Sequence, residues 1–175
     1  MNLAHFFRIR LFSIFLILVL GSFSVSVYAQ NTGAYTQLSS LQNQLATGSS
    51  NLALLETVNS MQNLSSTQNK ITVKSSGLYF VMAAGQVGAI KEGVNGYVDL
   101  WLIQNGKAVA NSNTRLTVDN KSTSVLVSQT LIQLKAGDTI SVGYSASDSS
   151  MGLIATPETN SEPAIPSIIF SMYKI

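Results

Sequence analysis

The sequence has no cysteine and a single histidine, His5, which lies near its N-terminus. The absence of cysteine excludes disulfide bonds, thiol redox chemistry and thiolate metal sites. Charged residues make up only 10% of the chain, and there is one tryptophan, Trp101. If the N-terminal segment is removed, the remaining chain also lacks the imidazole on which many metal centres and catalytic proton transfers depend near neutral pH.

The N-terminal segment has the three parts of a secretory signal peptide. Residues 1–10 include two arginines, residues 11–20 are almost wholly apolar, and Val27-Tyr28-Ala29 resembles a cleavage site. The apolar run is shorter than the roughly 20 residues of a membrane span. We therefore expect residues 1–29 to be cleaved, with a retained membrane anchor as the alternative. The protein is then secreted, periplasmic or held at the cell surface, with no stable membrane insertion.

Cleavage would leave residues 30–175, a length that suits one domain with a substantial core. The sequence has ten Lys and Arg against eight Asp and Glu, and loss of Arg8 and Arg10 leaves eight of each sign. A mature chain with a net charge near zero argues against nucleic acid as a partner.

From Ile71 onward, apolar residues recur mostly at every second position, which is typical of strands with one face on a core. Residues 98–103 and 140–144 show this alternation clearly. Asn105-Gly106 predicts a tight hairpin, because both residues tolerate positive φ. Three prolines precede a final apolar segment, residues 167–175. The pattern predicts an all-β sandwich or jelly roll.

The segment before Ile71 allows two interpretations. Within residues 34–46, apolar side chains fall at spacings of three, three and four, which would suit a short helix or a coiled-coil neck. The same residues also fit a first strand over Ala34–Leu38, followed by irregular β pieces. We favour the strand, and expect another strand over Leu52–Val58.

Two segments carry a recognisable pattern: Gly77-Leu78-Tyr79-Phe80-Val81, and residues 131–142, which follow L-x-L-x-x-G-D-x-apolar-x-V. The first is similar to the central signature of the C1q/tumour-necrosis-factor superfamily, and the second resembles a later segment of the same superfamily. The hairpin over residues 98–109 and the apolar C-terminus complete the order, so the resemblance covers roughly residues 35–175.

The resemblance implies a jelly roll of about ten strands that assembles as a homotrimer and acts by binding. The chain departs from the C1q pattern at Val81, where an aromatic residue is expected, and at Met172, which follows Phe170-Ser171 in place of a glycine-like position. It also lacks a collagen-like stalk. With its signal peptide, the chain is interpreted as a stalkless, bacterial C1q-like domain.

In the resembled fold, the first, third, sixth and last main strands form the sheet that faces the three-fold axis. Here we expect those strands to carry, in turn, Tyr35, Tyr79, Tyr144 and Tyr173. Tyrosine suits an interface because its large ring buries apolar area while its hydroxyl finds a partner. All four are trimer-interface candidates, with Tyr79 and Tyr144 the strongest, although one or two of the rings are expected in the monomer core.

Trp101 alternates with Leu100 and Leu102, so it faces outward if those two leucines face the core. An outward indole is a ligand-binding candidate that stacks on a sugar or anchors a partner. The alternative is a partly covered aromatic at a sheet edge or subunit contact.

The carboxylates are dispersed and suggest no acid/base couple, so we expect no enzymatic activity, no cofactor and no metal. Asp138, after Gly137, is interpreted as a turn residue that accepts bonds from nearby backbone N–H groups. Calcium, which needs several oxygen ligands, is a weaker alternative at Asp119-Asn120 and Asp148.

The sequence thus predicts a secreted, non-catalytic, trimeric module that recognises an extracellular protein or glycan. Two alternatives remain: an exported carbohydrate-binding or carbohydrate-active sandwich domain, and a structural component of a surface or matrix. A monomeric mass would favour the carbohydrate-binding sandwich.

Overall fold

A computed structural model describes residues 33–119 and 122–175. Within these ranges all the named elements of secondary structure are β-strands. The expected signal peptide, residues 1–29, lies outside the described residues. In the same ranges no helix has the length and apolar character needed to cross a membrane. The strands are β1 (Tyr35–Ser40), β2 (Gln44–Leu45), β3 (Asn51–Leu52), β4 (Thr57–Gln62), β5 (Leu64–Thr67), β6 (Lys70–Val73), β7 (Gly77–Ala89), β8 (Gly96–Gln104), β9 (Lys107–Ala108), β10 (Thr114–Val118), β11 (Thr123–Leu134), β12 (Thr139–Ala146), β13 (Met151–Leu153) and β14 (Ile168–Lys174).

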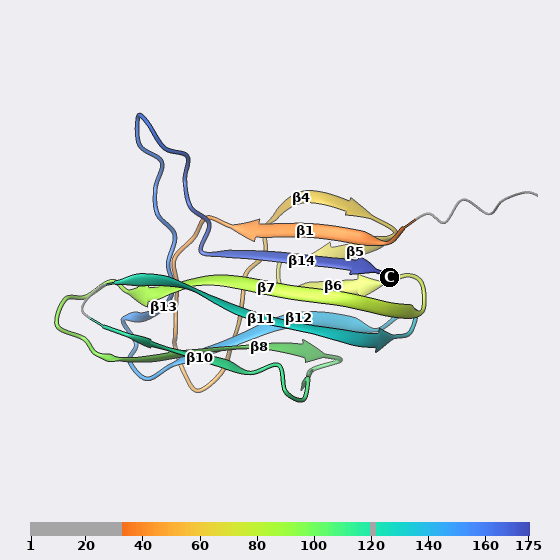
Figure 1. Ribbon diagram of the computed structural model, residues 1–175, viewed down its shortest axis with the longest axis horizontal. Helices are drawn as coiled ribbons and strands as arrows, with labels where there is room; N and C mark the ends of the chain where they lie inside the picture. The colour runs from red at the N-terminus through yellow and green to blue at the C-terminus, as the bar shows by residue number, and fades with distance from the viewer. Residues whose placement is uncertain (1–32, 120–121) are drawn as a thin grey trace, which may run out of the picture. The chain divides into compact units, whose positions relative to one another are not determined.

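The strands form two antiparallel sheets. In sheet A the order is β11–β7–β14–β1–β4 (Figure 1). The short strand β13 pairs with the end of β7, and β2 pairs with β13. In sheet B the order is β10–β8–β12–β6–β5, with β3 beside β12 and β9 beside β8. The first and last long strands are neighbours, and the chain passes between sheets as it does in a jelly roll. The expected fold class is confirmed, and the four additional strands are only two or three residues long.

The core lies between the sheets and is built by strict alternation. On β7, Tyr79, Val81 and Ala83 point inward and are fully buried. On β8, Leu100 and Leu102 are equally buried and belong to the same cluster. Each fully buried aliphatic or aromatic side chain contributes about 1.5–3 kcal/mol to folding, so this two-sheet cluster is what holds the sandwich together.

The N-terminal segment is a strand, as favoured, and not a helix. β1 pairs along its length with β14, which aligns Tyr35 with Tyr173. The single strand expected over residues 52–58 is wrong. There β3 ends at Leu52 and β4 begins at Thr57, because the backbone of Ala53 donates to Val142 of sheet B before the chain crosses to sheet A.

The hairpin at Asn105-Gly106 is confirmed. Both residues have positive φ, 50° and 78°, and Gln104 pairs directly with Lys107 across the turn. This backbone geometry matches the right-handed twist of the flanking strands.

Asp138 ties that hairpin to the turn between β11 and β12. Its carboxylate accepts hydrogen bonds from the side chains of Asn105 (2.8 Å) and Gln104 (3.0 Å) and from the backbone N–H of Lys135 (2.9 Å). The bond from the Lys135 backbone is the largest cause of a lowered Asp138 pKa. The interpretation of Asp138 as a turn residue is therefore confirmed.

We expect Asp138→Asn to lower the melting temperature by a few degrees at neutral pH. The pKa of Asp138 is lower in the folded protein than in the unfolded chain, so the ionised carboxylate stabilises the fold at any pH above the unfolded-state pKa. This stabilisation is lost as the pH falls through the folded-state pKa. The difference from the parent chain should therefore shrink between about pH 5 and about pH 2. Calorimetric melting across this range tests it. The exposed Glu158→Gln is the control for charge alone, and an Asp138→Asn deficit that does not shrink at all as the pH falls would contradict the assignment.

Candidate interaction surfaces

The outer side of sheet A carries no charge. Among its seven strands the one charged residue is Lys174, which lies at the end of β14 in register with the inward-facing Tyr79. Large apolar side chains on this side are exposed in the single chain, as Leu131 (58%) and Tyr173 (49%) illustrate. We call this surface the uncharged face. Its defining residues are Tyr35, Leu78, Phe80, Val125, Val127, Leu131, Ile169 and Tyr173.

One row of the uncharged face runs across four strands. Leu131 on β11 pairs with Phe80 on β7, which pairs with Tyr173 on β14, which in turn pairs with Tyr35 on β1. The Phe80 and Tyr173 rings are in contact, with centroids 5.3 Å apart. An exposed apolar row across four strands is a candidate site of association, since monomeric proteins rarely expose large contiguous apolar patches. The next row on the same side is mostly polar and also uncharged, with Gln129, Ser171 and Gln37.

The four interface candidates divide between surface and core. Tyr35 and Tyr173 lie on the uncharged face, 42% and 49% exposed. Tyr79 is fully buried inside the monomer, where its hydroxyl donates to the backbone oxygen of Ser75 at 2.7 Å. The ranking of Tyr79 as a leading interface candidate is therefore wrong, because its ring faces the opposite side of sheet A.

Tyr144 was also assigned to the wrong sheet. It lies on β12 of sheet B and is 4% exposed, and burial raises the pKa of its phenol. Its hydroxyl donates to the backbone oxygen of Leu45 at 3.3 Å. Among strands of five or more residues the sixth is β11, and it contributes Leu131 to the uncharged face instead.

The second surface is the outer side of sheet B around Trp101. As expected, Trp101 faces outward, between the buried Leu100 and Leu102. Its indole lies over Gly143, the residue paired with it on β12. A Cβ at Gly143 would overlap the ring, so glycine at this position is what allows the indole to lie down on the sheet.

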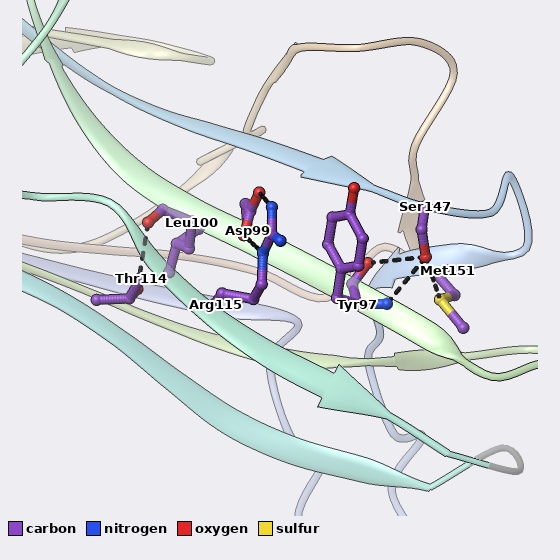
Figure 2. A network of polar contacts seen from close by, with 7 residues as sticks. All are labelled: Tyr97, Asp99, Leu100, Thr114, Arg115, Ser147 and Met151. Carbon is purple, nitrogen blue, oxygen red and sulfur yellow. Dashed lines mark hydrogen bonds and ion pairs between the residues drawn. The ribbon is translucent and has the colours of Figure 1, made fainter.

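A salt bridge lies two residues along β8 from Trp101. Asp99 accepts two hydrogen bonds from Arg115 of β10, from Nε at 2.7 Å and from Nη2 at 2.8 Å. Figure 2 shows Arg115 reaching from its own strand to Asp99, with Tyr97 beside them. The guanidinium carbon lies 3.7 Å from the centre of the Tyr97 ring, a cation–π contact. The bond to Asp99 is the main cause of a raised Arg115 pKa.

Together these residues form what we call the Trp101 face. The Asp99 side chain is only 10% exposed, whereas that of Arg115 is 56% exposed. The buried carboxylate therefore holds the guanidinium in place, and the guanidinium itself is accessible to solvent. The residues of the Trp101 face are Leu52, Tyr97, Asp99, Trp101, Arg115 and Ser145.

The calcium sites considered at Asp119-Asn120 and Asp148 are not supported by a cluster of carboxylates among the described residues. The Asp148 carboxylate accepts from both the backbone N–H and the hydroxyl of Ser150, which lowers its pKa and caps a turn. Asn120 lies outside the described residues. Within residues 33–119 and 122–175, no group of three His, Cys, Asp or Glu side chains could hold a metal ion.

A pocket of about 440 Å³ lies at the base of the loop between β13 and β14. This loop projects well beyond the strands at one end of the sandwich (Figure 1). The pocket combines small apolar side chains with a single carboxylate, and its lining is Leu41, Asn43, Ala155, Thr156, Pro157, Glu158 and Ala164. It brings together none of the candidate residues named from the sequence.

The uncharged face was missed from the sequence, although a signal was present. Residues 123–134 form the twelve-residue strand β11 with no charge in it. In the sequence only the end of this strand is distinctive, as the start of the L-x-L-x-x-G-D segment. The partners of Leu131 across the sheet come from residues far away in the chain, so the row itself becomes visible only with the strand register.

No family model matches the chain, and no curated protein matches it. Among solved structures, the chain is similar to the globular domain of zebrafish complement 1qA protein. The alignment has 14% sequence identity and a TM-score of 0.49, and it covers 81% of this chain and 96% of the zebrafish domain. The jelly-roll fold itself is defined by the strand order and core of this chain.

Proposed function

We propose that the protein is an exported, non-catalytic recognition module that assembles as a homotrimer through the uncharged face. The observation that carries this proposal is the row from Leu131 to Tyr35, with no charge on the outer side of its sheet. Charged residues are depleted at the cores of protein interfaces, whereas aromatic residues are enriched there.

The chemistry of the face favours a second copy of the chain as its occupant. It offers no charge with which to select a charged partner, and its tyrosine hydroxyls can pair with the many Ser, Thr and Gln side chains of an identical neighbour. In a trimer each contact is heterologous, so Tyr35 and Leu131, toward opposite edges of the same side of sheet A, meet different surfaces of neighbouring copies.

The lack of charge also has a consequence for β11. It is an edge strand of sheet A, twelve residues long and uncharged. An exposed edge of this kind is an aggregation hazard unless it is covered. Assembly through the uncharged face would bury the apolar side chains of this strand, and this removes the apolar part of the hazard but not the unpaired backbone groups along the edge.

Single cysteines test the occupied face, because the chain has none of its own. We expect Leu131→Cys to react with a maleimide at least about tenfold more slowly than Leu52→Cys, since a cysteine inside an interface is shielded from the reagent. Leu52 is the matched control, because it is 48% exposed on the other sheet against 58% for Leu131. Equal rates at micromolar chain concentration would count against the proposal.

The export part of the proposal makes a separate prediction. Expression of the whole sequence in a secreting host should yield a product that begins at Gln30, because Ala29 directly precedes it and Val27 lies two residues before Ala29, as in an A-x-A-like cleavage site. Intact mass spectrometry of the exported protein measures the loss of residues 1–29. An exported species that retains the apolar run 11–20 would show that the segment is an anchor.

A further inference from the structure

We infer that the Trp101 face binds a neutral oligosaccharide, with the indole as a stacking platform and Arg115 as a hydrogen-bond donor to sugar hydroxyls. The inference specifies a ligand for the proposed recognition role but does not depend on the trimer. The four observations that support it are the fixed indole, its free N–H, the oriented guanidinium and the balanced charge of the face.

The indole is held as a platform before any ligand arrives. It lies over Gly143, where any side chain would displace it, and it comes from the middle of a central strand, not from a loop. Leu52 on β3 pairs with Gly143 and extends the apolar surface. A rigid aromatic with few rotatable bonds provides contact area at a low entropic cost.

The indole also keeps a polar group available. Within the described residues, no protein acceptor is hydrogen-bonded to Nε1 of Trp101. An indole N–H that finds no partner in the protein can donate to a ligand, and binding sites typically combine aromatic walls with a few such polar groups.

Arg115 provides further donors in a fixed orientation. Two of the five guanidinium N–H groups are bound by Asp99, and the ring of Tyr97 lies against the guanidinium plane. Asp99 leaves up to three N–H groups unbound, and Tyr97 also contacts the guanidinium, so at least one terminal N–H group is left for a ligand. Ser145, across from Asp99 on β12, adds a hydroxyl beside them.

The charge and length of the face narrow the class of ligand. Asp99 neutralises Arg115 directly, so the centre of the face has no net charge with which to select an acidic or basic ligand. Tyr97 and Trp101 stand four residues apart on β8, about 13 Å along a strand, which exceeds a single sugar ring. Alternating C–H faces and hydroxyl groups along a neutral oligosaccharide match the Trp101 ring and, further along β8, the donors of Arg115, whose guanidinium covers one face of the Tyr97 ring.

The test is a calorimetric titration of the protein that comprises residues 30–175. The titrants are neutral tetrasaccharides of glucose, mannose and galactose, and a tetrasaccharide of a uronic acid. We expect one or more neutral sugars to bind and the acidic sugar not to bind. Trp101→Ala and Gly143→Ala should each weaken binding about tenfold or more, as truncation of a binding anchor does. Tyr173→Ala, on the uncharged face, should leave sugar affinity unchanged.

Each other outcome overturns the inference: binding of none of the sugars at millimolar concentration, binding of the acidic sugar alone, or full affinity in Trp101→Ala. Retained affinity in Gly143→Ala, with a circular dichroism spectrum like the parent, would do the same. Measuring mass in the same samples separates the two proposals, because sugar binding by a single-chain species would defeat the trimer only.

Discussion

Leu131→Glu should convert a three-chain assembly into single chains. Leu131 is exposed in the monomer, so the substitution is tolerated by the fold, but in the assembly it would bury a carboxylate on an uncharged surface. Burying an unpaired charge costs several kcal/mol per ion, and each 1.4 kcal/mol is a factor of ten in an equilibrium constant. We expect the affinity of assembly to fall by at least about a hundredfold, measured by sedimentation at micromolar concentration.

Leu52→Glu is the matched control for this prediction. It places the same new charge at a leucine of similar exposure on the outer side of sheet B. It should leave the mass of the assembly unchanged. If both variants behave alike, the effect reflects added charge in general, and the uncharged face has no special role in assembly.

Tyr79→Ala should act on folding instead of assembly. The ring is fully buried, and its hydroxyl bonds to Ser75. Removal of a buried aromatic side chain costs about 3–5 kcal/mol, which is a large part of the 5–15 kcal/mol by which domains are stable. Urea unfolding, followed by the fluorescence of the single tryptophan Trp101 at one chain concentration, measures the loss.

Tyr79→Phe separates the ring from its hydroxyl. It retains the packing and loses the two hydrogen bonds of the hydroxyl with the backbone oxygen and the side chain of Ser75, so the cost should fall to about 1–2 kcal/mol. Tyr173→Ala, where the ring lies on the surface, should barely change unfolding of the single chain. A Tyr79→Ala chain that unfolds at the parent's urea concentration would contradict the placement of this ring in the core.

The sequence was sufficient to predict the fold class. Alternation at Leu100 and Leu102 identified the inner side of β8, and Asn105-Gly106 identified its hairpin. These signals are local, because a strand on a core and a two-residue turn impose their constraints within a few residues. Trp101 was placed outward by the same reasoning, and the structure agrees.

Sheet membership could not be obtained in the same way. Tyr79 and Tyr144 alternate with the same period as surface tyrosines, and only the strand order shows which side of which sheet each one faces. Nor did any local pattern reveal that Gly143 lies under Trp101, or that Arg115 reaches Asp99. Those contacts depend on the registers of β8 with β12 and β10, which join distant parts of the chain.

Light scattering of residues 30–175 at micromolar concentration tests the central claim most directly. If the uncharged face is covered by neighbouring copies, the measured mass is that of three chains. On dilution, the mass measured for the Leu131→Glu variant should fall towards that of one chain. The mass of the parent protein at the same concentration should stay at three chains. A mass of one chain for the parent protein would contradict the account and favour a monomeric sandwich that acts through its Trp101 face alone.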